Sequence, residues 1–136
     1  MKKVDNVLIV DDDPTSSFLI SITLKELDIA GMIAKVYNGK QALDYLETEF
    51  VSTSYTGKQP DSLLILLDLN MPVMNGFEFL DEFTTQYATL QIKVTICILT
   101  SSVSPRDITR ARQYPIAGFI TKPLAAENLL PILAKV

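Results

Sequence analysis

The sequence predicts an α/β domain built on a parallel β-sheet with helices on both of its faces. Short apolar runs alternate five times with stretches in which apolar residues recur every three or four positions. A strand, a helix and a second strand form a parallel pair with a right-handed crossover, so repeated alternation covers both faces. The chain has 136 residues, of which 48% are apolar. This length suits one domain, over residues 1–136, with a substantial core.

Five apolar runs are the predicted strands. They are residues 7–10, 33–36, 63–67, 94–99 and 118–121. Residues 63–67 and 96–99 are apolar at successive positions, which is typical of central parallel strands that are buried on both faces. The stretch 51–59, rich in Ser, Thr and Gly, leads from a helix back to a strand. It is therefore expected at the edge of the sheet opposite the ends of the strands.

Local capping signals mark where the helices begin. Asp13 followed by Pro14 combines a capping acid with a proline at the first helical position. We expect that helix to continue to about residue 27, with Phe18, Leu19 and Ile22 on its inner face.

Four further helices are expected. They begin at the Asn38-Gly39 turn, near Phe77, at Ser104-Pro105 and near Ala125. Pro131 falls inside the last helix, where the missing N–H is expected to kink or shorten it.

Composition and charge exclude several classes of protein. The net charge of −4 and pI near 4.7 argue against direct binding of nucleic acid. A single cysteine, Cys97, permits no internal disulfide, which fits a reducing compartment. No apolar run is long enough to cross a membrane, so a cytoplasmic protein is expected. The chain has no histidine, so any phosphohistidine chemistry must involve a histidine of a partner.

Reactive side chains follow four of the predicted strands. Because the carboxyl ends of parallel strands meet at one edge of a sheet, we expect these side chains to lie together. Clustered carboxylates repel one another unless a cation shares their charge. Acids, hydroxyl groups and an ammonium at one edge indicate a Mg²⁺-assisted phosphoryl acceptor. The residues concerned are Asp11, Asp12, Asp13, Asp68, Thr100, Ser101 and Lys122.

With these motifs the chain resembles the receiver domain of two-component response regulators, in particular stand-alone, chemotaxis-regulator-like receivers. The resemblance covers residues from about 4 to 136 and rests on four features. They are an acid pair after the first strand, Asp-Leu-Asn-Met-Pro at 68–72 followed by Asn75-Gly76, Thr100-Ser101, and Lys122-Pro123. The family fold is flavodoxin-like, so the resemblance implies strand order 2-1-3-4-5, five helices and three layers.

The resemblance also implies roles for the acids. Asp68 matches the phosphoacceptor, a carboxylate nucleophile that forms an acyl phosphate. Asp11 and Asp12 match the metal-binding pair, which would hold Mg²⁺ or Mn²⁺ together with Asp68 and the backbone carbonyl of Asn70. Asp13 is better placed as a helix cap, although spacing leaves open which of the three acids binds the metal.

Further matches concern the response to phosphorylation. Thr100 matches the switch hydroxyl, Ser101 could donate its backbone N–H to the phosphoryl group, and Lys122 matches the lysine that pairs with acceptor and phosphate. Phe119 matches an aromatic residue that moves with Thr100. The family often has a cis bond before the proline that follows the lysine. Asn70 and Ser102 occupy positions associated with the rate of dephosphorylation.

The function implied is a phosphorylation-dependent signalling switch rather than an enzyme. The donor would be a sensor histidine kinase or a histidine phosphotransfer protein, acting directly or in a phosphorelay. Phosphorylation would shift the face formed by the fourth helix, fifth strand and fifth helix, which would contact an unidentified downstream protein. Neither nucleic acid nor a membrane is an expected partner.

Three alternatives stay open at this point. The chain could be a degenerate receiver that serves as a scaffold without being phosphorylated. A flavodoxin-like electron carrier would need a phosphate-binding loop after the first strand, where three aspartates would instead repel phosphate. A hydrolase acting through an aspartyl phosphate commonly has a second acid two residues after the nucleophile, and Asn70 occupies that position.

Overall fold

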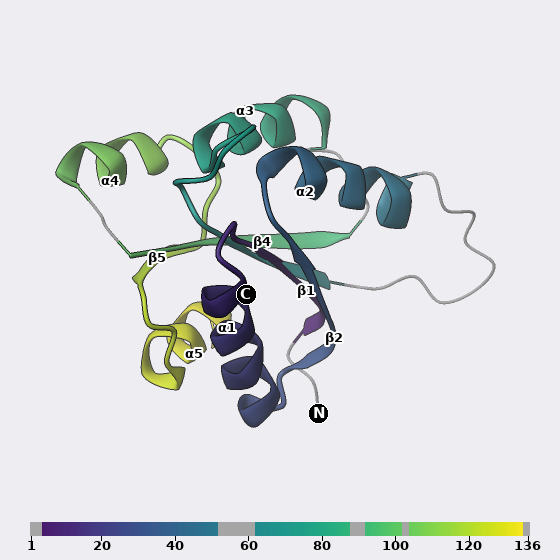
Figure 1. Ribbon diagram of the computed structural model, residues 1–136, viewed down its shortest axis with the longest axis vertical. Coiled ribbons are helices and arrows are strands. Elements are labelled where there is room, and N and C mark those ends of the chain that lie inside the picture. The colour runs from purple at the N-terminus through teal and green to yellow at the C-terminus, as the bar shows by residue number, and fades with distance from the viewer. Residues whose placement is uncertain (1–3, 52–61, 88–91, 102–103, 135–136) are drawn as a thin grey trace.

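The fold is a five-stranded parallel sheet enclosed by helices (Figure 1). The computed structural model describes residues 4–51, 62–87, 92–101 and 104–134. The strand order is β2-β1-β3-β4-β5, which confirms the expected 2-1-3-4-5 topology. The strands are β1 (Val4–Val10), β2 (Ala30–Val36), β3 (Ser62–Leu67), β4 (Lys93–Thr100) and β5 (Gly118–Thr121).

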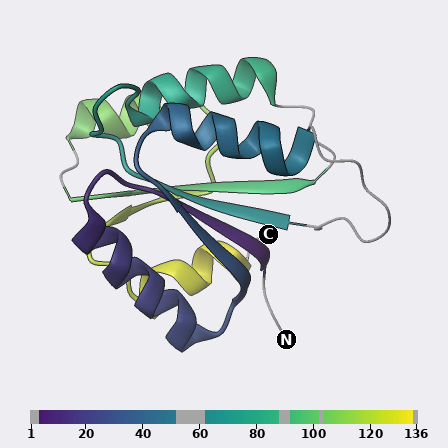
Figure 2. The same cartoon turned by 45° about the vertical axis from the view of Figure 1, so that its right-hand side comes forward.

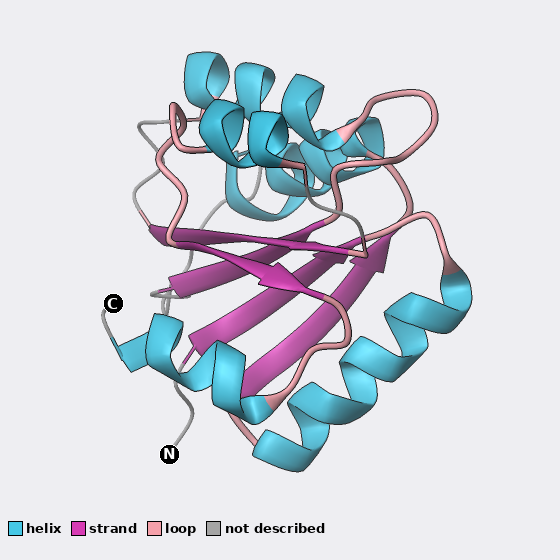
Figure 3. Cartoon of the chain, turned by 90° about the vertical axis from the view of Figure 1, so that its left-hand side faces the viewer, coloured by secondary structure: helices cyan, strands magenta, loops and turns pink. Residues whose placement is uncertain are grey.

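The helices form two layers, one on each face of the sheet. Helices α1 (Pro14–Leu27) and α5 (Ala126–Ala134) cover one face, as Figures 2 and 3 show. Helices α2 (Gly39–Leu46), α3 (Gly76–Gln86) and α4 (Pro105–Ala111) cover the other. A π-helical turn, η1 (Glu47–Val51), extends α2. Most of the stretch expected to be irregular, at 51–59, lies outside the described residues.

The sheet separates two apolar clusters because successive side chains of a strand point to opposite faces. In β3, Leu64 and Leu66 pack on the α1 and α5 side. Leu63, Ile65 and Leu67 pack on the side of the other three helices. The strand is buried on both faces, as its apolar sequence predicts. Cys97, in the middle of β4, is a free thiol with no exposed surface.

Helix starts follow the capping signals in the sequence. Four helices begin directly after a residue whose side chain accepts a hydrogen bond from a backbone N–H in the first turn. These N-caps are Asp13, Asn38, Asn75 and Ser104. Asn75 also exchanges hydrogen bonds with Glu78, so α3 starts with a reciprocal capping box.

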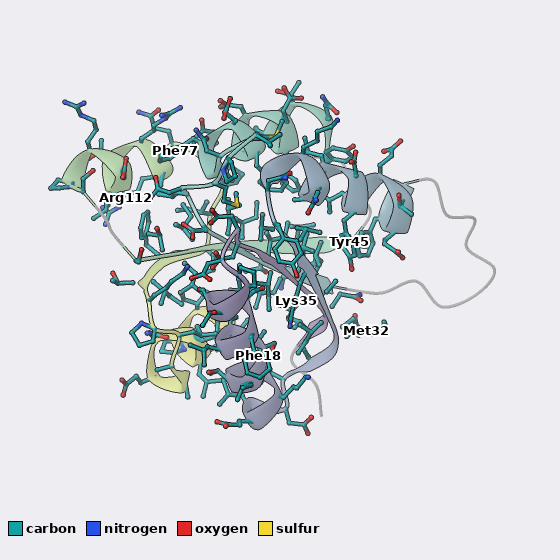
Figure 4. The ribbon with its side chains drawn as sticks, in the orientation of Figure 1. Phe18, Met32, Lys35, Tyr45, Phe77 and Arg112 are labelled. Carbon is teal, nitrogen blue, oxygen red and sulfur yellow. The ribbon has the colours of Figure 1, made fainter. Side chains whose placement is uncertain are left out.

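Helix α1 packs with a different face from the one expected. Phe18 and Leu19 are 55% and 57% exposed, and Ile22 is only partly buried. The residues of α1 that are buried are Ser17, Ile20, Ser21 and Leu24. The prediction failed because Ile20 and Leu24 form a second apolar pair at helical spacing, next to serines that let the helix approach the sheet. In Figure 4, Phe18 lies on the side of α1 near Lys35, whose Nζ is 5.8 Å from the ring centroid.

Helix α5 contains Pro131 and extends three residues beyond it to Ala134. Its N-terminus is held by Asn128, whose side-chain oxygen accepts the N–H of Ala125 at 3.0 Å. Leu129 and Leu133 are buried, whereas Pro131 is exposed. The proline therefore occupies the solvent side of a helix only nine residues long. Within the described residues, no helix has the length and apolarity that a membrane span requires.

Candidate functional site

The carboxyl edge of the sheet collects the residues singled out in the sequence. Asp11 follows β1, Asp68 follows β3, Thr100 ends β4 and Lys122 follows β5. The backbone pairing continues beyond the strands. Asp11 donates its N–H to Val36, Asp68 donates to Val10, and Lys122 donates to Thr100. Because the ladder reaches these residues, their backbones are fixed where the side chains converge.

Asp68 lies at the centre of this edge with 6% of its surface exposed. Its Oδ1 accepts a hydrogen bond from Thr100 Oγ1 at 3.1 Å and one from the backbone N–H of Asn70 at 3.2 Å. Its Oδ2 accepts from Lys122 Nζ at 3.1 Å. These three donors fix the orientation of the Asp68 carboxylate, and a carboxylate oxygen is a group that can act as a nucleophile.

Asp11 is also almost completely buried, with 1% of its surface exposed. Its Oδ1 accepts the N–H of Asp13 at 2.9 Å. Its Oδ2 accepts from Lys122 Nζ at 2.6 Å and from Ser16 Oγ at 2.8 Å. Sequence reasoning missed Ser16, because the contact runs from the first turn of a helix back to the end of a strand.

Lys122 joins the two buried carboxylates through one ammonium group. Burial of this ammonium acts to lower its pKa, but the hydrogen bonds and charges of Asp11 and Asp68 outweigh that effect. The pKa of Lys122 is therefore raised above its usual value. The Lys122–Pro123 peptide bond is cis, as the family resemblance implies.

The acids at this edge form a set suited to a metal ion. Asp11, Asp12 and Asp68 each offer a carboxylate oxygen, and these oxygens lie within 4.8 Å of one another. Asp12 is exposed, so the set opens to solvent on one side. Hard oxygen ligands of this kind fit Mg²⁺ or Mn²⁺. Asp13 is the N-cap of α1, and its Oδ1 accepts the N–H of Thr15 at 3.0 Å.

The remaining predicted residues lie around this centre. Asn70 is exposed and donates its backbone N–H to Asp68. Ser101 is exposed at the end of β4. Phe119 is partly buried against the apolar cluster under α2, α3 and α4. Ser102 lies outside the described residues.

The loop after β3 has a strained backbone that sequence reasoning also missed. Val73 has φ 68°, and the Met74 N–H donates to the Pro72 carbonyl at 2.7 Å across it. A β-branched residue in this left-handed region is unusual and costs free energy. Gly39 holds the loop, since its N–H donates to the Met74 carbonyl at 2.9 Å. A Cβ at Gly39 would lie 2.9 Å from the Met74 carbonyl oxygen, a backbone atom, which explains the need for glycine there.

Comparison with known families decides the identity of this arrangement. The response regulator receiver domain family matches residues 7–134. The chain belongs to this family. A receiver domain is the signalling domain of two-component response regulators.

Solved structures agree with this assignment. The two-component response regulator of Cytophaga hutchinsonii is 30% identical, with a TM-score of 0.83, over 98% of this chain and 97% of that one. The chemotaxis protein CheY4 of Vibrio cholerae is 27% identical, with a TM-score of 0.69, over 98% of both chains. The receiver fold is therefore matched along nearly the whole sequence.

Curated relatives include longer proteins. The probable methanogenesis regulatory protein FilR2 of Methanothrix harundinacea is 31% identical over 90% of this chain and 75% of its own length. The protein-glutamate methylesterase/protein-glutamine glutaminase of Treponema pallidum is 34% identical, but the chain spans only 27% of that protein. The similarity to such relatives therefore concerns their receiver part.

Proposed function

We propose that this receiver domain is a switch operated by phosphorylation of Asp68. The donor would be the phosphohistidine of a sensor histidine kinase or a histidine phosphotransfer protein. The observation that carries the proposal is the pair of donors on the Asp68 carboxylate, Lys122 Nζ at 3.1 Å and Thr100 Oγ1 at 3.1 Å. Both could transfer their hydrogen bonds to a phosphoryl group attached to Asp68.

The chemistry follows from the groups that surround the acceptor. A carboxylate oxygen of Asp68 attacks phosphorus, the P–N bond of the phosphohistidine breaks, and its electron pair returns to the imidazole of the donor. Asp11, Asp12, Asp68 and the Asn70 carbonyl would hold Mg²⁺ or Mn²⁺. When bound, that ion supplies positive charge that offsets repulsion between the acids and the phosphoryl group. Lys122 adds a second positive charge from the side of β5.

The switch would operate through residues that already contact Asp68. Thr100 would move its hydroxyl to donate to a phosphoryl oxygen, and Ser101 would offer its backbone N–H. Phe119, in β5, would move together with Thr100 and so pass the change to the face formed by α4, β5 and α5. Phosphate contacts would favour one of two arrangements of that face and so change its affinity for a downstream protein.

We also propose that the chain is one receiver unit over residues 1–136 and that it signals without turning over a substrate. The family match at 7–134 supports the first point. Asn70, which cannot act as a general acid, supports the second. A cytoplasmic location stays a prediction from the sequence. The convergence of Asp11, Asp68, Thr100 and Lys122 favours phosphorylation over the alternative of an unphosphorylated scaffold.

Intact-mass spectrometry tests the acceptor directly. The protein is incubated with Mg²⁺ and acetyl phosphate or phosphoramidate. We expect one added phosphoryl group, which is lost in Asp68→Asn and in EDTA. Asp44→Asn, on the exposed surface of α2, is the matched control and should label as the wild type does.

Two results would contradict the proposal. Full labelling of Asp68→Asn would place the phosphoryl group on another residue. A wild-type protein that accepts no phosphoryl group from either donor, or from a histidine kinase, would favour the scaffold.

A further inference from the structure

We propose that Ser16 is a positioning residue that orients the carboxylate of Asp11 for metal binding. The inference rests on the proposed function, because it concerns the metal site that phosphorylation of Asp68 would use. It also concerns a hydroxyl that the receiver motifs of this sequence do not include.

The contact is specific in its geometry. Ser16 is the third residue of α1, after the N-cap Asp13, and is half-buried. Its Oγ donates to Asp11 Oδ2 at 2.8 Å, five residues back along the chain. At this helix position a side chain often reaches back to the backbone of the N-cap. Here the Ser16 hydroxyl does not bond to the N-cap residue and instead donates to Asp11, the buried acid that follows β1.

The hydrogen bonds divide the two oxygens of Asp11 into different roles. An ionised carboxylate offers about two acceptor sites on each oxygen. Oδ2 accepts from Ser16 at 2.8 Å and from Lys122 at 2.6 Å, which fills both of its sites. Oδ1 accepts only the N–H of Asp13 at 2.9 Å among the described residues. Ser16 therefore helps to leave Oδ1 as the oxygen that is available to a cation.

Lys122 cannot perform this orientation alone. Its ammonium is shared with Asp68, at 3.1 Å, and would move toward a phosphoryl group there. Asp11 has 1% of its surface exposed, so water would replace a lost donor poorly. Ser16 is fixed to α1 and would keep its bond to Oδ2 while Lys122 moves toward the phosphoryl group. Partners that orient a metal ligand in this way commonly change metal affinity by about 10- to 100-fold when they are removed.

The adjacent serine provides a matched control. Ser17 is in the same helical turn and is 1% exposed, and within the described part of the chain its Oγ has no hydrogen-bond partner. Replacing it with alanine removes a hydroxyl from α1 without touching Asp11.

Isothermal titration calorimetry with Mg²⁺ alone tests the role of Ser16. Relative to the wild type, we expect Ser16→Ala to raise the Kd by about 10-fold or more. Ser16→Thr keeps a hydroxyl at this position, so its Kd for Mg²⁺ should lie within about 3-fold of the wild-type value. Ser17→Ala should leave the Kd unchanged. Far-UV circular dichroism and urea unfolding establish that each variant is folded.

A second measurement separates orientation from general damage. The rate at which acetyl phosphate labels Asp68 is measured over a range of Mg²⁺ concentrations. In Ser16→Ala the concentration for half-maximal rate should rise while the rate at saturating Mg²⁺ stays near that of the wild type.

An unchanged Kd in Ser16→Ala, or an equal loss in Ser17→Ala, overturns the inference while wild-type labelling still supports the proposed function. If the wild type binds no Mg²⁺ and accepts no phosphoryl group, both fail.

Discussion

Helices α1 and α3 both begin at the carboxyl edge of the sheet, but they bury different kinds of side chain. Helix α3 packs its apolar residues inward, and those that are buried are Phe77, Phe79, Leu80 and Phe83. Helix α1 buries two serines with Ile20 and Leu24 and leaves Phe18 and Leu19 exposed. Apolar periodicity thus identified both helices, but the face that it predicted for α1 is not the face that packs.

The two helices differ in the contacts that their first turns make at the edge of the sheet. Helix α3 starts at Gly76, where a Cβ would lie 2.6 Å from the Asp68 carbonyl oxygen, and a capping box fixes its first turn. Its aromatic residues then continue one stripe. Helix α1 is held at its start by the cap at Asp13 and by the bond from Ser16 to Asp11, and Ser17 in the same turn is buried. Polar contacts at the start of a helix can therefore decide which of its two apolar faces packs against the core.

The largest effect that tests this comparison is expected inside α3. Phe79 has no exposed surface, and its ring stacks on Phe83 with 5.9 Å between centroids. Phe79→Ala should lower the free energy of unfolding by about 3–5 kcal/mol, because it removes buried surface and leaves a cavity. Urea unfolding followed by circular dichroism measures the change. A loss below about 1 kcal/mol would contradict the tight packing of α3.

An intermediate effect is expected on the buried face of α1. Ser17→Leu adds an apolar side chain at a position that is 1% exposed, so the helix must move or the side chain must adopt a strained rotamer. We expect a loss of about 1–3 kcal/mol, measured by urea unfolding beside the near-neutral Ser17→Ala. A stabilised Ser17→Leu variant would show that the serines do not limit how closely α1 packs.

The smallest effect is expected on the outer face of α1. Leu19 is 57% exposed, so Leu19→Gln should change the free energy of unfolding by no more than about 0.5 kcal/mol. Leu24→Gln, at a residue with no exposed surface, is the matched control and should be strongly destabilising. Equal losses in the two variants would mean that Leu19 is buried in solution.

Local signals predicted most of the fold, because strands and caps depend on neighbouring residues. The sequence placed the starts of α1, α2 and α4 at their N-caps and found all five strands. It began β1 and β2 three residues late. Asp5 and Asn6 interrupt the apolar run of β1, and Gly31 and Met32 lie exposed in β2, an edge strand without clear alternation. A Cβ at Gly31 would lie 2.6 Å from the Asp5 carbonyl oxygen, so this glycine marks close approach of two strands rather than a turn.

The candidate site was predictable where residues follow strands, because topology alone brings Asp11, Asp68 and Lys122 to one edge. The contacts that refine the site were not. The bond from Ser16 to Asp11 depends on the rotation of α1. The left-handed backbone of Val73 lies in a loop whose Met74 carbonyl accepts the N–H of Gly39, the first residue of α2. Such contacts are set by the packed structure and leave no pattern in adjacent residues.

Because Cys97 is buried at the centre of the sheet, the reactivity of its thiol can be used to measure opening of the sheet. The chain has one cysteine, and burial raises its pKa to about 12, so the reactive thiolate is scarce in the folded state. A thiol reagent can modify it only when the centre of the sheet separates. The rate of modification at several reagent concentrations therefore measures how often the sheet opens, without an added label.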